Sequence, residues 1–361
     1  MHGTGALGHV VADAYALGDG DWAMEPVARG ALGQIWKLTR KHAPNGASGS
    51  PAVRPADGPA DGGLSDGPAW AVKELLFDGD EEQVLRESEL RDAAERLGIA
   101  SPRLFSDRAG ACLTRLGGSP DGPWVKLYEW VDGVRADASD PEVLSWCGRT
   151  LAALHRAGAE ASGTPDPWYE RCPSPAEWAE LHSQVRRAGV PWSDALGRFV
   201  ASDAGELARH VTASVTEGVP ADGEEVVMSH LDVKPQNVLV GTRGPVLLDW
   251  DNAGPTSAGR ELAQAVFVWS GGNDFHAGSA RRLVRAYREA GGRPVLRGLG
   301  SFSMLFATAL NYVRVQAECA IDPTVTPAQR EFASGQVVAS LRDLPDPAAV
   351  ARLAQCLESA G

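Results

Sequence analysis

Hydrophobic and polar residues alternate over residues 22–40, and the stretch Gly30-Ala31-Leu32-Gly33 interrupts this alternation. Because successive side chains of a strand point to opposite faces, the pattern predicts two strands joined by a tight turn. Further short strands are predicted at 70–75, 103–106, 111–115 and 124–131. The first third of the chain is therefore expected to form a β-sheet.

A helical period of 3.6 residues appears between about Asp80 and Leu97, where Leu90 and Ala94 share one face and Gly98 suits the C-cap. The rest of the chain repeats this period, with capping signals at several helix starts. Helices are predicted between Asp140 and Gly158, after the capping box Ser174-Pro175-Ala176-Glu177, within 194–216, and at 259–271, 277–290, 298–319, 327–343 and 347–358.

The order of these elements predicts how the chain is organised. Residues 44–68 are dense in Pro, Gly, Ala, Ser and Asp, and such a run cannot bury a core, so we expect a flexible surface insertion there. Strands come first and helices follow, which predicts an α+β protein. We expect a small β-rich lobe at residues 1–131 and a larger, mainly helical lobe at residues 132–361.

Composition restricts the partners of the chain. Its 361 residues carry a formal net charge of −13, which argues against broad binding of nucleic acid, because that needs a basic surface. No apolar stretch approaches the roughly 20 residues that a membrane span requires. The five cysteines are scattered, as expected of reduced thiols, and no signal peptide is evident. We therefore expect a cytoplasmic monomer or homodimer that binds neither nucleic acid nor membrane.

The segment from His230 to Asn237 reads His-Leu-Asp-Val-Lys-Pro-Gln-Asn and carries the most specific chemical signal in the chain. Asp232 and Asn237 have the spacing of the pattern His-x-Asp-x-x-x-x-Asn. Phosphoryl transfer requires an acceptor hydroxyl held in line and a phosphate whose charge is neutralised. Since an aspartate can hold that hydroxyl and accept its proton, Asp232 is the candidate catalytic residue.

A predicted β-hairpin follows this segment. Residues 238–240 and 246–248 read as strands around a turn at 241–244, and Asp249 ends the second strand. A hairpin of this kind returns Asp249 to the neighbourhood of Asn237. Because Mg²⁺ prefers oxygen ligands, Asn237 and Asp249 are predicted to share Mg²⁺.

Lys73 lies in the predicted strand at 70–75, where a lysine can pair with the phosphates of a nucleotide. Such a lysine needs an acidic partner, which the following helix can supply. We expect Glu87, near the middle of that helix, with Glu89 as the alternative. The glutamates of this helix are Glu81, Glu82, Glu87, Glu89 and Glu95.

Two further segments are candidates for nucleotide contact. Gly30 and Gly33 can bring backbone N–H groups close to phosphates, although two glycines are equally typical of a plain β-turn. Glu129-Trp130-Val131-Asp132-Gly133 marks the change from strand-rich to helix-rich sequence. Glu129 and Val131 are assigned to the nucleotide base by this position alone.

Together these residues resemble the aminoglycoside phosphotransferase and choline kinase-like superfamily, distant relatives of the protein kinases. The resemblance runs from the Gly30–Gly33 turn through Lys73 and the Leu151–His155 helix end to Asp249-Trp250. It implies a two-lobed, protein-kinase-like fold that holds ATP or GTP between its lobes and uses Mg²⁺. The implied roles are catalysis for Asp232, metal binding for Asn237 and Asp249, phosphate binding for Lys73 with Glu87, and bracing of the loop for His230.

Two positions depart from the usual pattern of this superfamily. Val233-Lys234-Pro235 is closer to protein kinases, so Lys234 either contacts the transferred phosphate or is simply exposed. Arg260-Glu261-Leu262 stands where the family usually has Asp-Leu-Ala, and a bracing role is not carried over to Glu261. No Ala-Pro-Glu segment follows Asp249, which argues against a protein kinase and for a small-molecule acceptor.

The acceptor must carry a hydroxyl, because Asp232 needs a proton to receive. We expect an antibiotic, of aminoglycoside or other type, with a sugar, homoserine or an amino alcohol as the metabolic alternative. A catalytically inactive, nucleotide-binding regulator is a third hypothesis. It is disfavoured because the residues whose loss would have supported it are all present: Lys73, Asp232, Asn237 and Asp249. Acidic residues that could hold a cationic acceptor are Asp194, Asp203, Glu206, Asp251, Glu318 and Asp322.

Overall fold

The computed structural model describes residues 4–30, 33–41, 68–76, 79–118, 122–159, 163–217, 226–293, 296 and 298–358. The insertion predicted at 44–68 lies outside the described residues, apart from Pro68. The chain forms two compact units, Met1–Leu85 with Pro102–Asp132, and Arg86–Ser101 with Gly133–Gly361. The lobe boundary expected between residues 131 and 132 stays a prediction.

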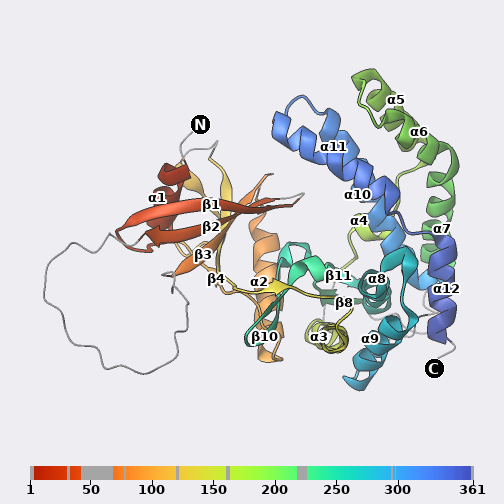
Figure 1. The fold of residues 1–361 in the computed structure, drawn as a ribbon, viewed down its shortest axis with the longest axis horizontal. Coiled ribbons are helices and arrows are strands. Elements are labelled where there is room, and N and C mark those ends of the chain that lie inside the picture. The colour runs from red at the N-terminus through yellow and green to blue at the C-terminus, as the bar shows by residue number, and fades with distance from the viewer. Residues whose placement is uncertain are drawn as a thin grey trace, which may run out of the picture. The chain divides into compact units, whose positions relative to one another are not determined.

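The first unit is built on an antiparallel sheet with the strand order β1-β2-β3-β6-β4, and β5 also pairs with β6 (Figure 1). The strands predicted at 22–40 and 70–75 are confirmed, and that at 124–131 ends two residues early. Those predicted at 103–106 and 111–115 shorten to two residues each. The strands are β1 (Asp21–Arg29), β2 (Gly33–Lys41), β3 (Ala69–Leu75), β4 (Leu104–Phe105), β5 (Thr114–Arg115) and β6 (Trp124–Glu129).

Helix α1 (Thr4–Ala14) packs against this sheet, and the sequence pattern did not predict it. Its buried residues Val11 and Ala12 join the buried Trp22 and Leu38 of β1 and β2 in one apolar cluster. The hydroxyl of Tyr15, just after the helix, donates to the carbonyl of Val125 on β6 at 3.2 Å. These tertiary contacts stabilise a helix of only 11 residues, which is marginal alone in water.

The second unit is mainly helical and contains the largest apolar cluster of the described residues. Leu90 and Ala94 of α2 (Glu81–Arg96) belong to this cluster, as the helical period predicted for their shared face. The other helices are α3 (Pro141–Ala157), α4 (Pro167–Glu170), α5 (Pro175–Ala188), α6 (Ser193–Ser202), α7 (Ala204–Glu217), α8 (Ala258–Ser270), α9 (Ala277–Glu289), α10 (Ser303–Ile321), α11 (Pro327–Arg342) and α12 (Pro347–Glu358).

The capping signals in the sequence are confirmed. Asp140 caps α3, and the Ser174 hydroxyl with the Glu177 carboxylate forms the capping box of α5. The single helix expected within 194–216 is instead two helices that meet at Asp203. The break allows the buried Phe199 of α6 and Leu207 of α7 to reach the same core.

Two small antiparallel sheets frame the segment His230–Asn237. β9 (Val238–Gly241) pairs with β10 (Gly244–Leu247) in the predicted hairpin, and β7 (Val134–Arg135) pairs with β9. β8 (Val226–Ser229) pairs with β11 (Gly254–Ser257), a strand that the sequence pattern did not predict. Among the residues that the structure describes, none of the helices has the length and apolar character needed to cross a membrane.

Candidate active site

The segment between β8 and β9, here called the catalytic loop (His230–Asn237), has a conformation that neighbouring groups impose. Leu231 has a φ of 66°, which is unfavourable for a non-glycine residue and costs roughly 1–3 kcal/mol. Its backbone N–H donates to Oε1 of Glu261 at 2.7 Å. The indole N–H of Trp269 donates to the carbonyl of Val233 at 2.9 Å. The loop is thus held on both sides of Asp232.

The carboxylate of Asp232 is oriented by its two neighbours in the loop. Nδ2 of Asn237 donates to Oδ2 of Asp232 at 2.8 Å and to the Asp232 carbonyl at 3.0 Å. Nζ of Lys234 lies 2.8 Å from the same Oδ2. The side chain of Asp232 is only 16% exposed. Two donors on one oxygen leave Oδ1 as the oxygen suited to accept the proton of a substrate hydroxyl.

His230 is fully buried beside Asp232 and Trp250, with the His230 and Trp250 ring centroids 4.8 Å apart. Burial lowers the pKa of His230 below its ordinary value of 6.5, although the charge of Asp232 opposes this shift. Nε2 lies 3.0 Å from the carbonyl of Leu248, which can only accept, so Nε2 carries the proton. Nδ1 therefore accepts from the Asp232 N–H at 3.3 Å, and the neutral ring braces the loop.

Asn237 and Asp249 lie next to each other through the hairpin. The backbone N–H of Leu248 donates to the Asn237 carbonyl at 2.8 Å, which brings Asp249 beside Asn237 as the sequence predicts. Both amide hydrogen bonds of Asn237 go to Asp232, so its Oδ1 remains suited to a cation. Asp249 has a left-handed φ of 62°. An amide oxygen and a carboxylate fit Mg²⁺, which takes few protein ligands when phosphates supply the others.

A buried chain of polar groups supports the loop from behind. Nε2 of His155 on α3 lies 2.8 Å from Oε2 of Glu261, and Nδ1 lies 2.8 Å from the hydroxyl of Tyr287 on α9. Burial alone would raise the pKa of Glu261, but the hydrogen bond and charge of His155 and the Leu231 N–H together hold that pKa below its usual value. Glu261 therefore braces the loop, although it replaces the Asp that the superfamily usually has there and the role was not carried over to it from the resemblance.

The first unit brings a second lysine beside Lys73. Lys73 on β3 is 7% exposed and directly opposes Lys126 on β6, which is 2% exposed. Direct cross-strand partners share one face of a sheet, so both amines lie on the same face. A Cβ on Gly33 would lie 2.9 Å from the Glu74 carbonyl and 3.3 Å from Cε of Lys73, which explains the glycine there. Sequence patterns gave no signal for Lys126.

The other residues predicted to contact the nucleotide differ in their burial and in the unit to which they belong. Glu87 is buried in the second unit, whereas Glu89 and the other glutamates of α2 are exposed, which favours Glu87 over Glu89. Lys73 and Glu87 belong to different units, so their pairing stays a prediction. The N–H of Gly30, after the end of β1, donates to the carbonyl of Gly33, the first residue of β2, at 2.9 Å. Glu129 ends β6, and Val131 follows it at an intermediate exposure.

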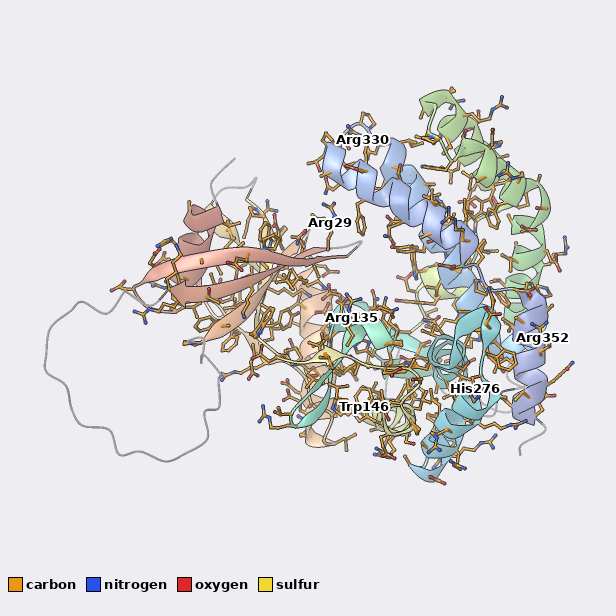
Figure 2. The ribbon with its side chains drawn as sticks, in the orientation of Figure 1. Arg29, Arg135, Trp146, His276, Arg330 and Arg352 are labelled. Carbon is orange, nitrogen blue, oxygen red and sulfur yellow. The ribbon has the colours of Figure 1, made fainter. Side chains whose placement is uncertain are left out.

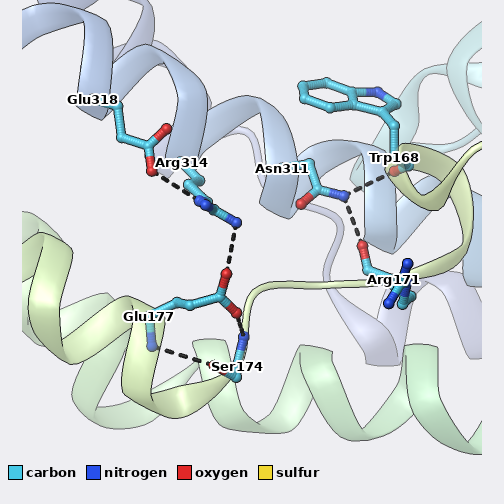
Figure 3. A network of polar contacts seen from close by, with 7 residues as sticks. All are labelled: Trp168, Arg171, Ser174, Glu177, Asn311, Arg314 and Glu318. Carbon is cyan, nitrogen blue, oxygen red and sulfur yellow. Dashed lines mark hydrogen bonds and ion pairs between the residues drawn. The ribbon is translucent and has the colours of Figure 1, made fainter.

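A polar network joins α4 and the residue after it to α10 within the second unit (Figure 3). Nδ2 of Asn311 on α10 donates to the carbonyls of Trp168 and Arg171 at 2.8 and 2.7 Å. Tyr169 packs with Leu231 and Met304 in one apolar cluster. Burial, followed by the charge of Asp232, raises the pKa of Tyr169, so its hydroxyl stays protonated near the carboxylate of Asp232.

A cleft of about 270 Å³ lies between α10 and α11. Its polar lining comprises Tyr312, Gln336, Ser340 and Asp343. The Tyr312 hydroxyl donates to Oε1 of Gln336 at 3.0 Å, and burial and then the charge of Asp232 raise the Tyr312 pKa. At the turn between the two helices, the guanidinium of Arg330, labelled in Figure 2, donates to the carbonyl of Val325 at 2.6 Å.

The acidic residues proposed for a cationic acceptor do not line this cleft. Glu318 pairs with Arg314 at 2.9 Å, and Asp322 accepts from the Thr324 N–H and hydroxyl. Asp194, Asp203 and Glu206 are exposed on or beside α6 and α7. Asp343, which the sequence analysis did not single out, is the carboxylate of the cleft. Only the packing of α11 against α10 reveals it.

The fold places the chain among kinase-like proteins. Spectinomycin phosphotransferase in complex with ADP and spectinomycin superimposes with a TM-score of 0.62, 13% identity and 98% of both chains covered. The microcompartment-associated aminopropanol kinase gives a TM-score of 0.55 and 13% identity over 96% of this chain and 99% of that one. The predicted α+β fold, with a sheet-containing N-terminal part and a mainly helical C-terminal part, is confirmed.

The family follows from the sequence match. Residues 65–299 match the phosphotransferase enzyme family, so the chain belongs to that family and is a kinase-type phosphotransferase. Homoserine kinase from Beijerinckia indica subsp. indica is 25% identical over 245 residues, which cover 65% of this chain and 71% of that protein. The resemblance stated from the motifs is therefore confirmed.

Proposed function

We propose that the protein transfers the γ-phosphate of ATP, or of GTP, to a hydroxyl group of a small molecule with the help of Mg²⁺. The observation that carries this proposal is the geometry of Asp232, whose Oδ2 is occupied by Asn237 and Lys234 while Oδ1 is left for the acceptor. In the transfer, the acceptor oxygen forms a bond to the γ-phosphorus as the bond to the β-γ bridging oxygen breaks. The hydroxyl proton passes to Asp232, and the nucleoside diphosphate leaves.

The proposal assigns the metal to Asn237 and Asp249, where bound Mg²⁺ would neutralise phosphate charge. Lys73 and the Gly30–Gly33 turn are assigned to the nucleotide phosphates, with Glu87 as the partner of Lys73, and Glu129 and Val131 to the base. Lys234 is assigned to the transferred phosphate, because its amine already lies 2.8 Å from the catalytic carboxylate. We place the protein in the cytoplasm, where Mg-nucleotide is available.

For the acceptor, we favour a small hydroxylated amine of the homoserine or amino alcohol class. The cleft between α10 and α11 supports this choice, because its volume of about 270 Å³ falls just below the roughly 300–1,000 Å³ of drug-sized ligand pockets and therefore suits a smaller acceptor. Asp343 provides a carboxylate for an ammonium group, and the hydroxyl of Tyr312, whose pKa is raised first by burial and then by the charge of Asp232, lies in the same cleft. The likeness to homoserine kinase supports the same class.

An antibiotic acceptor is the second candidate. The fold similarity to spectinomycin phosphotransferase over nearly the whole chain favours it, since such an acceptor is itself hydroxylated and can carry amines. A larger acceptor would extend beyond the α10–α11 cleft. The two candidates therefore differ in the size of molecule that is turned over.

A turnover assay with Mg-ATP or Mg-GTP and a panel of hydroxylated molecules tests the proposal. The panel pairs homoserine and 1-amino-2-propanol with spectinomycin and aminoglycosides, and ³¹P NMR identifies the phosphorylated product. We expect a phosphate monoester of at least one panel member. Tight binding of nucleotide without turnover of any acceptor would contradict the proposal and support the inactive regulator.

A further inference from the structure

A second cleft in the helical unit lies between α3 and α9, and its charge is opposite to that of the whole chain. It has a volume of about 450 Å³ and is lined by Ser145 and Arg149 from α3 and by Arg282, Arg285 and Glu289 from α9. Three guanidinium groups thus face one carboxylate, in a chain whose formal net charge is −13. None of these residues belongs to the candidate active site.

The guanidinium groups of this cleft are available to a ligand. Within the described part of the chain, Arg149 and Arg282 have no hydrogen-bond or ion-pair partner. Nε of Arg285 lies 3.9 Å from Oε1 of Glu289, and both side chains are more than 60% exposed, at 63% and 70%. Such an exposed ion pair contributes little to stability, so a bound anion can readily replace Glu289 as the partner of Arg285. An anion therefore meets little competition from within the protein.

The two helices that carry these arginines are packed tightly against each other. A Cβ on Gly148 would lie 2.3 Å from the Leu283 carbonyl and 2.9 Å from the Tyr287 N–H nitrogen, so α3 and α9 are in backbone contact next to the cleft. Farther along the same helices, the bond between His155 and the Tyr287 hydroxyl joins them again. A cleft between tightly packed helices loses less conformational entropy on binding a ligand than a cleft between flexible segments would.

We propose that the cleft between α3 and α9 is a binding site for a small phosphate-bearing anion, held by Arg149, Arg282 and Arg285. A guanidinium presents parallel N–H donors that match two oxygens of a phosphate, and a tetrahedral anion can accept from both helices at once. The volume lies within the range of small-molecule sites, about 300–1,000 Å³. This site is separate from the one proposed for the nucleotide and does not depend on catalysis.

Calorimetric titration of the full chain with inorganic pyrophosphate, in buffer without Mg²⁺, tests the site. We expect one bound pyrophosphate per chain, and about 10-fold weaker binding in each of Arg149→Gln and Arg282→Gln, because each loses charge-assisted hydrogen bonds. Two matched variants should bind like the wild type. They are Arg352→Gln, an exposed arginine of α12 labelled in Figure 2, and Glu180→Gln, at an exposed position of α5.

A gain of affinity provides a test that misfolding cannot imitate. Glu289→Gln removes the carboxylate that repels an anion and competes for Arg285, so pyrophosphate should bind about 2- to 5-fold more tightly. Added salt should weaken binding to the wild type, since the interaction is electrostatic. Absence of pyrophosphate binding, weakening by Arg352→Gln as large as that in the cleft variants, or unchanged affinity in Glu289→Gln would each overturn the site.

Discussion

Glu261 accepts a hydrogen bond from the backbone N–H of Leu231 at 2.7 Å, while its other oxygen lies 2.8 Å from Nε2 of His155. Leu231 is the residue before Asp232 and is held in a left-handed conformation. The buried carboxylate therefore stabilises the backbone that presents the proposed catalytic group. Its partners lie on α3 and in the catalytic loop, so one side chain joins two distant parts of the sequence.

Replacing Glu261 by Gln should destabilise the fold and slow turnover. The amide keeps the shape of the side chain but loses the charge, so the free energy of unfolding should fall by about 2–3 kcal/mol. Because a small displacement of Asp232 misplaces the acceptor, kcat should fall by about 10- to 100-fold. Urea unfolding and steady-state kinetics measure both effects. Glu180→Gln, at an exposed position of α5, is the control, and equal behaviour of the two variants would disprove the bracing role.

The burial of His230 predicts a dependence of stability on pH. Its pKa is below 6.5 in the folded protein, so below pH 6.5 the unfolded chain binds a proton that the folded chain does not. The contribution of neutral His230 to the free energy of unfolding is thus complete above pH 6.5. It is lost as the pH falls toward the lowered pKa, by at most about 1.4 kcal/mol per pH unit.

Urea unfolding between about pH 7.5 and about pH 5 measures this slope. Glutamine at position 230 retains a donor toward the Leu248 carbonyl but does not titrate, so His230→Gln should show a shallower slope than the wild type. If the two slopes coincide, another group is responsible for the pH dependence.

Asp232→Asn should remove phosphoryl transfer while nucleotide binding is retained. The amide cannot accept the acceptor's proton, so kcat should fall by about 10²- to 10⁴-fold. Nucleotide affinity should change by less than about 3-fold, because the proposal assigns the nucleotide to other residues. Product formation followed by ³¹P NMR and calorimetric titration of the nucleotide measure the two quantities. Asp194→Asn, on the surface of α6, is the control; undiminished turnover in Asp232→Asn would contradict the catalytic assignment.

Glu87 and Glu89 provide a matched pair on one helix. Only Glu87 is buried, so Glu87→Gln should weaken binding of Mg-nucleotide by about 10-fold through the loss of the proposed pairing with Lys73, and Glu89→Gln should have no such effect. Lys73→Met should weaken nucleotide binding at least as strongly. Titration of a non-hydrolysable nucleotide gives the three affinities. Equal losses in Glu87→Gln and Glu89→Gln would reject Glu87 as the partner.

Asp343 should determine recognition of an amine. Asp343→Asn is expected to raise KM about 10-fold for an acceptor that carries an ammonium group, with kcat changed little, because the carboxylate contacts the acceptor away from its reacting hydroxyl. The KM of an uncharged alcohol of similar size should not change. Glu331→Gln, exposed on the same helix, controls for the loss of negative charge. An equal increase of KM for both kinds of acceptor would contradict the role.

Local signals in the sequence were enough for the catalytic loop and its hairpin. The spacing of Asp232 and Asn237, the turn at 241–244 and the position of Asp249 all lie within 20 residues, so short-range geometry determines them. The caps at Asp140 and Ser174 are equally local, because each hydrogen bond spans two or three residues. The break at Asp203 was missed, since it depends on which face of each helix reaches the core.

The sequence by itself determined the reaction class, because a phosphotransferase loop is a contiguous motif whose spacing reflects its chemistry. It also determined the order of sheet and helices, because hydrophobic periods are local. Only the tertiary structure revealed the bracing by Glu261, the second lysine beside Lys73, and the clefts that α10 and α9 form with their neighbours. His155 and Tyr287 are 132 positions apart, and contacts over such separations arise from packing, which no short pattern encodes.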